Sequence, residues 1–318
     1  MLDYNEAPYL ELANYKAPKD AKFLFVPMKD KKNIRLAYWQ SNTDLNKSKG
    51  TILLQQGHNE FIEKYYETIN DFLEEGYNVV SFDWRGQGMS DRMLSDINIQ
   101  FTENFDTYNE DFTFILNEIV KPYFPQPLIG IGHSMGGCLL LSSLDRHQED
   151  FSHIILSAPM LGFKKEMLLS SMLRVSSLLF KKESYVPLSK PNMGKETPFL
   201  ENDLTYDHGR YERTLRLVRM KPKIRLWGVS IAWGIAAIKR LKKIRTSKWL
   251  DKINSKILFI NSLEDKVVNP KSTMLIQKKL KNSKIINLSE IKHEIFMEKD
   301  DKRGALMNEI FKFIENKE

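Results

Sequence analysis

The sequence predicts an α/β fold: a doubly wound core in which helices cover both faces of a mostly parallel central sheet. Short runs of β-branched and aromatic residues alternate with longer helical patterns, which is typical of parallel sheets. The strand runs are also almost continuously apolar, as expected for strands buried on both faces. The chain has 318 residues, 42% of them hydrophobic, and can therefore bury one large core.

The order of the elements defines the expected domains. Two strands come first, and alternating helices and strands follow. The strands are predicted at residues 23–26, 34–39, 51–55, 78–82, 127–132, 153–157, 256–261 and 284–288. The core helices are predicted near residues 61–74, 105–119, 135–146, 270–281 and 301–316. From about 159 to 250, Met-rich and Leu-rich helical segments dominate without intervening strands. We therefore expect a core of residues 1–158 and 251–318, interrupted by a helical insertion of residues 159–250.

Composition narrows the location of the protein. The single cysteine, Cys138, excludes an intramolecular disulfide and is expected to be a small buried residue. The first residues lack the basic and then apolar order of a secretory signal, so we expect a cytoplasmic protein. No apolar run reaches the roughly 18 to 20 residues that a membrane span needs.

A basic run indicates a partner. The formal net charge is +7, which suits nucleic acid or anionic lipid. Six cations follow directly after the apolar residues 226–238, namely Lys239, Arg240, Lys242, Lys243, Arg245 and Lys248. A basic stretch beside an apolar one, without interleaved aromatic residues, favours peripheral contact with an anionic membrane over nucleic acid. The alternative is that the run is only the solvated face of a helix.

Ser134 is the predicted nucleophile. It lies in the sequence Gly-His-Ser-Met-Gly, between an apolar strand and a helical pattern. A GxSxG match alone occurs by chance in roughly one chain in ten of this length. The assignment therefore depends on the strand before the motif and the helix after it. A strand-to-helix turn strains the serine backbone and leaves no room for side chains two positions before or after the serine. Gly132 and Gly136 occupy these two positions and have no side chains.

Two backbone amides are predicted to form the oxyanion hole. The amide of Met135 begins the helix after the serine, where the helix dipole also stabilises negative charge. The second donor comes from the loop after the third strand, and we assign it to the amide of His58. The alternative is that Gly57 simply makes a turn there.

A serine hydroxyl needs an imidazole as its base and an acid that orients the imidazole. In the fold predicted here, the serine comes first along the chain, then the acid, then the histidine. Among the six histidines, only His293 lies in a loop between a late strand and the last helix. The acid is expected just after the strand 256–261. We prefer Asp265, because its short side chain beside two valines is easily held rigid, and keep Glu264 as the alternative.

Three segments together resemble the monoglyceride lipase and lysophospholipase branch of the α/β-hydrolases. They are GHSMGG at residues 132–137, DWRGQGMS at 83–90 and KHE at 292–294. The segments EDKVV at 264–268, HEIFME at 293–298 and NDLT at 202–205 are similar to bacterial lysophospholipases in particular. The resemblance covers nearly the whole chain. It implies Ser134, Asp265 and His293 as a catalytic triad, with the amides of His58 and Met135 as the oxyanion hole.

One position departs from the family pattern. Many members carry His-Gly in the oxyanion loop, where this chain has Gln56 and Gly57. The donor is a backbone amide, so we expect the change to affect loop support more than chemistry. The segment 83–90 resembles a structural turn that braces the sheet, and we expect no catalytic role for it.

The resemblance also implies that the insertion is a cap over the active site. The apolar segments 167–180 and 226–238 could line an acyl-chain tunnel, or their faces could simply pack on the core. The predicted function is cleavage of a carboxylic ester of a monoacyl lipid through an acyl-enzyme intermediate, with water activated through His293. No metal or organic cofactor is expected.

Other functions are compatible with the same residues. The protein could be an esterase or thioesterase for shorter acyl groups, or could transfer the acyl group to an alcohol. A peptidase is disfavoured, because the insertion shows no obvious acidic pair to hold a peptide amine. A catalytically silent lipid-binding protein would have lost the serine, the acid or the histidine, and all three are present.

Overall fold

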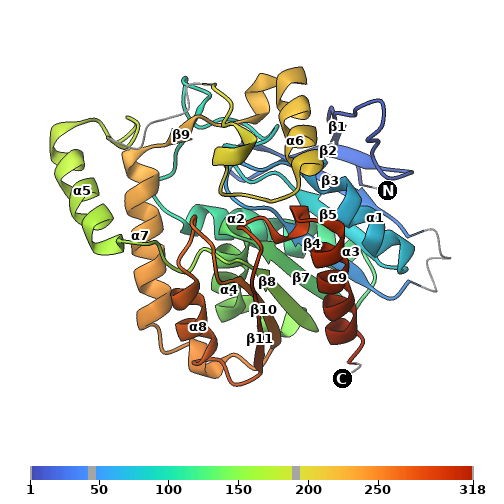
Figure 1. Cartoon of the computed structure of the whole chain (residues 1–318). Helices are drawn as coiled ribbons and strands as arrows, with labels where there is room; N and C mark the ends of the chain where they lie inside the picture. Colours follow the sequence, from blue (N-terminus) through green and yellow to red (C-terminus); the bar gives the residue numbers. More distant parts are fainter. Residues whose placement is uncertain (1, 42–47, 188–193, 317–318) are drawn as a thin grey trace.

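A central sheet organises the molecule. The structure is a computed structural model and describes residues 2–41, 48–187 and 194–316. Within these residues the main sheet has nine strands in the order β1-β2-β3-β5-β4-β7-β8-β10-β11. The pairs from β1 to β5 are antiparallel, and all later neighbours are parallel. Helices flank this sheet (Figure 1), so the predicted doubly wound, mostly parallel architecture is confirmed.

The observed elements lie close to the predicted ones. The strands of the main sheet are β1 Asn5–Glu6, β2 Lys22–Pro27, β3 Asn33–Trp39, β4 Thr51–Gln55, β5 Asn78–Phe82, β7 Leu128–His133, β8 His153–Ser157, β10 Lys256–Ser262 and β11 Ser283–Leu288. The helices outside the insertion are α1 Tyr66–Glu74, α2 Asp106–Ile115, α3 Lys121–Tyr123, α4 Met135–His147, α8 Pro270–Gln277 and α9 Asp300–Ile314.

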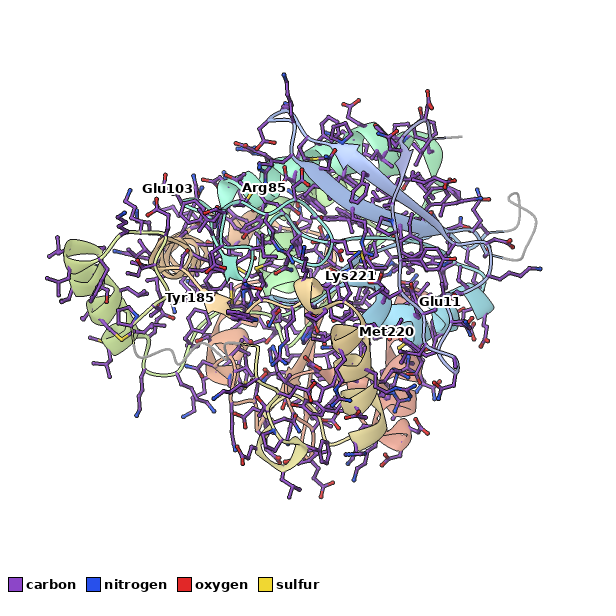
Figure 2. All side chains as sticks on the ribbon, turned by 90° about the horizontal axis from the view of Figure 1, so that it is seen from above. Glu11, Arg85, Glu103, Tyr185, Met220 and Lys221 are labelled. Atoms are coloured by element: carbon purple, nitrogen blue, oxygen red, sulfur yellow. The ribbon has the colours of Figure 1, made fainter. Side chains whose placement is uncertain are left out.

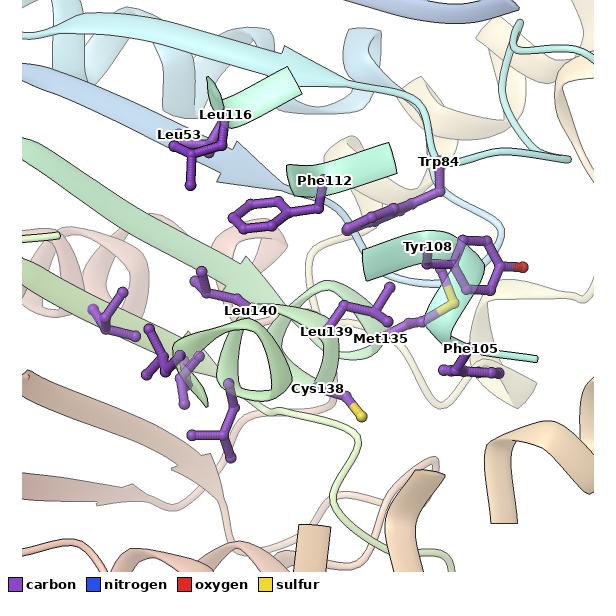
Figure 3. Close-up of a cluster of buried hydrophobic side chains, with 14 of the residues drawn as sticks. Leu53, Trp84, Phe105, Tyr108, Phe112, Leu116, Met135, Cys138, Leu139 and Leu140 are labelled. Atoms are coloured by element: carbon purple, nitrogen blue, oxygen red, sulfur yellow. The ribbon is translucent and has the colours of Figure 1, made fainter. Parts of the chain in front are cut away.

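Two apolar cores lie on opposite faces of the sheet. Alternate residues of β4 point to opposite faces, so Leu53 joins one core while Ile52 and Leu54 join the other. The core with Leu53 contains residues of α2, α4 and α8, and the other contains residues of α1 and α9. Figure 3 shows Met135 and Leu139 of α4 among the aromatic residues of the first core. Cys138 is fully buried there, as expected.

The insertion contains α5 Glu166–Leu179, α6 His208–Met220 and α7 Ile231–Thr246. The expectation that it has no strand is wrong, because β9 Gly228–Val229 pairs in parallel with β6 Ile99–Gln100. So short a pairing is set by tertiary contacts, here including the amide of Trp227 donating to the Asn98 carbonyl at 2.7 Å. Helix α7 therefore begins only after Ser230, whose side chain accepts from the Trp233 amide.

The two apolar segments of the insertion have different surroundings. Helix α7 buries most of its apolar residues, whereas α5 buries only Leu173 and Ser176. The side chains of Met167 and Leu178 are 87% and 85% exposed. Helix α5 packs on α7 and stands apart from the sheet in Figure 1. The core-packing interpretation therefore fits α7, and the outer face of α5 contacts neither a core nor a tunnel.

The basic run does not form one solvated face. Arg240 is buried and paired with Asp106, and Arg245 is paired with Glu166. The remaining cations of the run, Lys239, Lys242, Lys243 and Lys248, are exposed. Among the described residues, no helix has the length and apolar character needed to cross a membrane.

Candidate active site

Ser134 occupies a strained turn between β7 and α4. Its φ and ψ are 50° and −114°, in a region that L-residues other than glycine rarely adopt. The backbone of Ser134 is held by hydrogen bonds to Ser157 and Met160. A Cβ atom at Gly132 would lie 2.7 Å from Gly137 Cα, and one at Gly136 would lie 2.5 Å from the Gln56 carbonyl oxygen. Both glycines are therefore needed for the turn to close.

The three predicted triad residues meet at the carboxyl edge of the sheet. His293 lies in the loop after β11, and its Nε2 is 3.0 Å from Ser134 Oγ. His293 Nδ1 is 2.6 Å from Asp265 Oδ2, in the loop after β10. All three side chains are largely buried, with Ser134 7% exposed. This arrangement can pass a proton from the hydroxyl to the imidazole while the carboxylate fixes the imidazole tautomer.

The acid is held by backbone amides. Asp265 Oδ1 accepts hydrogen bonds from Val267 and Val268 at 2.7 and 2.9 Å. Burial raises the pKa of Asp265, but the hydrogen bond and charge of His293 and these two amides outweigh it, so the pKa lies below its usual value. The alternative acid, Glu264, is exposed, and its carboxylate accepts from the Glu290 amide instead.

The proposed oxyanion loop packs directly on the serine turn. A Cβ atom at Gly57 would lie 3.1 Å from Ser134 Cβ, so residues 56–58 line the turn beside the amide of Met135. The loop carbonyls are bound from the segment 83–90. Trp84 Nε1 donates to the Gln56 carbonyl, and the Gln87 side chain donates to the Gly57 carbonyl, both at 2.9 Å. This segment therefore braces the oxyanion loop, in addition to the sheet.

The insertion contacts both the loop that carries His58 and the loop that carries His293. The ring of His58 lies 5.0 Å from that of Trp233 on α7. On the other side, the amides of His293 and Glu294 donate to carbonyls of the segment 202–205, at 3.5 and 2.8 Å. Burial lowers the pKa of His58 to about 4, so its imidazole is neutral at pH 7. The segment singled out by its resemblance to lysophospholipases thus anchors the insertion beside the histidine.

A buried ionic cluster beneath the site was missed by the sequence analysis. Lys64 Nζ lies 2.7 Å from Glu60 Oε1 and 2.5 Å from Glu294 Oε1. Charged residues are usually exposed, so their pattern alone did not distinguish these three from surface residues. A signal was nevertheless present: Glu60 and Lys64 lie four residues apart just after the oxyanion loop, and Glu294 directly follows His293.

No group of His, Cys, Asp and Glu side chains within the described ranges is arranged to hold a metal ion.

The fold and this site define a hydrolase of the α/β-hydrolase class. The profile of the family described as "Serine aminopeptidase, S33" matches residues 46–300, and the chain belongs to this family. The chain is 27% identical over 297 residues to a probable lysophospholipase L2 of Haemophilus influenzae, covering 89% of this chain and 90% of that protein. It is 25% identical over 279 residues to lysophospholipase L2 of Escherichia coli, covering 82% and 79%.

Solved structures agree on the fold. The crystal structure of a soluble variant of monoglyceride lipase from Saccharomyces cerevisiae, in complex with a substrate analog, superposes with a TM-score of 0.74 at 16% identity, covering 96% of this chain and 99% of that one. A carboxyl esterase from Bacillus coagulans gives 0.74 at 19% identity, covering 93% and 98%. The resemblance to the lysophospholipase and monoglyceride lipase branch is confirmed, and these relatives belong to the predicted class of carboxylic ester hydrolases.

Proposed function

We propose that the protein is a serine hydrolase in which Ser134 attacks an ester carbonyl. The observation that carries the proposal is the continuous contact from Ser134 through His293 to Asp265, at 3.0 and 2.6 Å, on a strained turn. His293 Nε2 accepts the hydroxyl proton as the carbonyl is attacked, and returns it to the leaving alcohol. The amides of His58 and Met135 stabilise the oxyanion. Water activated by His293 then releases the acyl group from the serine.

We propose a monoacyl lipid as the substrate. Two of the relatives named above are lysophospholipases and a third is a monoglyceride lipase. The substrates in these names each have a single acyl chain. The insertion supports this assignment as a cap of residues 159–250, because Trp233 of α7 lies against the oxyanion loop. The same residues would also serve acyl transfer to an alcohol.

The nucleophile can be tested directly. Ser134→Ala should abolish ester hydrolysis and labelling by an active-site phosphonate, while the thermal melt stays within about 1 °C of the parent, because only one oxygen is removed. Labelling of the parent enzyme at Ser134, mapped by mass spectrometry, would exclude a catalytically silent binding protein. Full turnover in Ser134→Ala would contradict the mechanism.

Substrate choice needs a separate profile. We expect the ratio kcat/KM to be higher for long-chain monoacylglycerol or lysophospholipid than for esters of about four carbons, because an apolar cap gains affinity with each buried methylene. A preference for the short esters would favour the esterase alternative. Product analysis in the presence of glycerol separates hydrolysis from acyl transfer.

We also propose that the cap contacts anionic membranes through α5. The exposed apolar side chains there are Met167, Leu168, Val175, Leu178 and Leu179, followed by Phe180. A groove of about 470 Å³ between α5 and α7 is lined by the cations Arg174, Lys182, Lys239 and Lys242, together with Glu103. Figure 2 shows α5 projecting from the body beyond the labelled Glu103 and Tyr185. An apolar face with a basic border suits a bilayer surface with anionic headgroups.

Vesicle co-sedimentation tests this contact. Leu178→Ser should weaken binding to vesicles that contain anionic lipid, while Leu275→Ser, a 62% exposed leucine on α8, should leave binding unchanged. Added salt should weaken the binding of the parent protein, since the cations contribute. Equal binding to neutral and anionic vesicles, or equal effects of the two substitutions, would contradict the assignment.

A further inference from the structure

A buried lysine joins the two loops on which the reaction depends. Lys64 lies in the short 3₁₀ helix after the oxyanion loop, and its side chain is only 4% exposed. Its ammonium group contacts one carboxylate from each loop, Glu60 at 2.7 Å and Glu294 at 2.5 Å. The side chains of these carboxylates are 4% and 10% exposed, so the three charges are shielded from water.

Each carboxylate is coupled to a catalytic element. Glu60 Oε2 accepts a hydrogen bond from the Gly57 amide at 2.5 Å, which fixes the turn that presents the next amide, that of His58. The Tyr65 hydroxyl donates to the same oxygen at 2.8 Å. Glu294 directly follows His293 in the chain, so its position constrains the loop that carries the imidazole.

The charges require one another. Burial lowers the pKa of the Lys64 ammonium, but the charges of Glu294 and Glu60 outweigh this and raise it. Burial raises the pKa of Glu60, but the charges of Lys64 and His133 bring it below its usual value. Burial also raises the pKa of Glu294, and there the charge of Lys64 offsets the effect only in part. Without the ammonium, two carboxylates would face each other in a dry site, which is strongly unfavourable.

We propose that Lys64 is a positioning residue, which sets the distance between the oxyanion loop and the histidine loop by bridging Glu60 and Glu294. The inference rests on the proposed serine hydrolase reaction and adds to it a group that touches neither substrate nor reacting atoms. The oxyanion donors and the general base must act on the same carbonyl in one transition state, so a shift between the two loops affects rate more than binding.

The surface lysine Lys49 is a matched control. It also bridges two carboxylates, Glu75 at 3.3 Å and Glu315 at 2.9 Å, but its side chain is 43% exposed and lies away from the site. Lys64→Met keeps the aliphatic stem and removes the charge, and Lys49→Met makes the same change at the surface. Lys64→Arg keeps a cation that can bind both carboxylates.

The experiment measures kcat and KM on an ester of the favoured chain length. The end point of phosphonate labelling gives the concentration of active sites, by which each kcat is normalised. Per labelled site, Lys64→Met should lower kcat by about 100-fold with KM changed less than threefold, since misplacing catalytic groups by about 1 Å has an effect of this size. The kcat of Lys64→Arg should be at least tenfold higher than that of Lys64→Met. The kcat of Lys49→Met should equal that of the parent.

A second variant covers the case in which Lys64→Met does not fold. Glu294→Gln keeps the side-chain shape and the pair between Lys64 and Glu60, and should lower kcat by about tenfold at unchanged KM, which supports the same bridge. A kcat per labelled site within twofold of the parent in both Lys64→Met and Glu294→Gln would overturn the inference and reduce the cluster to a structural role. Absence of labelling in the parent would overturn the proposed function together with the inference.

Discussion

At the scale of single residues, backbone conformation places strict limits on the turn that carries Ser134. Ser134 has a positive φ, and the two glycines beside it leave no room for a Cβ atom. These features agree with the strained turn that the pattern around Ser134 predicts. In the proposed mechanism the Ser134 hydroxyl is the nucleophile, and the close approach of the neighbouring backbone determines where that hydroxyl points.

Replacement of Gly136 by alanine should therefore be severe. Its Cβ would lie 2.5 Å from the Gln56 carbonyl oxygen, which is backbone and cannot rotate away. We expect Gly136→Ala to destabilise the fold and to lower kcat at least 100-fold, because the oxyanion loop must move. Gly304→Ala is the control: nothing lies within 4 Å of its Cβ in the middle of α9, and alanine there should add up to about 1 kcal/mol of stability. Urea unfolding and ester turnover of both variants provide the comparison, and equal effects would contradict this account.

The proposed catalytic acid, Asp265, allows a second residue-scale prediction. Asp265→Asn keeps the hydrogen bonds from Val267 and Val268 available but presents an amide to His293 Nδ1. The imidazole then loses the carboxylate that fixes its tautomer, so kcat should fall by about 10⁴-fold while the melting temperature changes little. Glu264→Gln, which alters an exposed carboxylate, should retain parental turnover. A larger loss in Glu264→Gln than in Asp265→Asn would reverse the assignment of the acid.

At the scale of elements, apolar strands were the most predictable part of the fold. Residues 51–55, 78–82 and 153–157 were predicted with the bounds that the structure shows, since buried parallel strands have an unmistakable apolar pattern. The two-residue strands β1, β6 and β9 were missed because their pairing depends on tertiary contacts. The apolar pattern of α5 did not reveal that its outer face meets solvent, because periodicity does not identify what covers a face.

The candidate site likewise contains residues that the sequence could identify and residues that it could not. Ser134, Asp265 and His293 could be selected from chain order and loop position, which a single sequence displays. The cluster of Glu60, Lys64 and Glu294 joins residues about 230 positions apart, and no local pattern predicts such a contact. Burial of charge is a property of the folded molecule. For the same reason, the sequence did not show that Arg240, counted with the basic run, is buried and paired with Asp106.

An ionic cluster attaches α6 to the core and makes stability depend on pH. Glu67 of α1 binds Arg210 and Arg213 of α6. Burial raises the pKa of Glu67, but the hydrogen bonds and charges of Arg210, Arg303 and Arg213 lower it to about 2. The folded pKa is depressed, so the stabilisation is complete above the unfolded pKa, near 4.5, and is lost as pH falls toward 2.

We therefore expect the unfolding free energy to fall by on the order of 2 kcal/mol between pH 5 and pH 2 from this group alone. Glu67→Gln should be less stable than the parent at pH 7, and the difference should disappear near pH 2. Urea unfolding at several pH values measures it, with Glu309→Gln, at an exposed pair with Lys312, as the control. A constant difference between Glu67→Gln and the parent across this range would contradict the shift.

At the scale of the whole molecule, two parts of the insertion, α5 and the region from residue 202 through α6, are attached with unequal strength. Helix α6 is held by the Arg210 cluster, and the segment 202–205 is bonded to the histidine loop. Helix α5 packs mainly on α7 and buries two residues, Leu173 and Ser176. Local opening costs least where few apolar contacts are buried, so α5 should open at a free energy well below that of global unfolding.

Hydrogen exchange measured by mass spectrometry can resolve this difference. Amides of α5 should exchange at least 100-fold faster than those of α4, whose apolar residues lie in the core. If α5 is the membrane contact, vesicles with anionic lipid should slow its exchange and leave α4 unchanged, because binding removes the exposed leucines from water. Leu178→Ser should reduce that protection, while Leu275→Ser should not. Protection of α5 equal to that of α4 without vesicles would show that the cap is as firmly packed as the core, and protection by neutral vesicles alone would exclude a role for its cations.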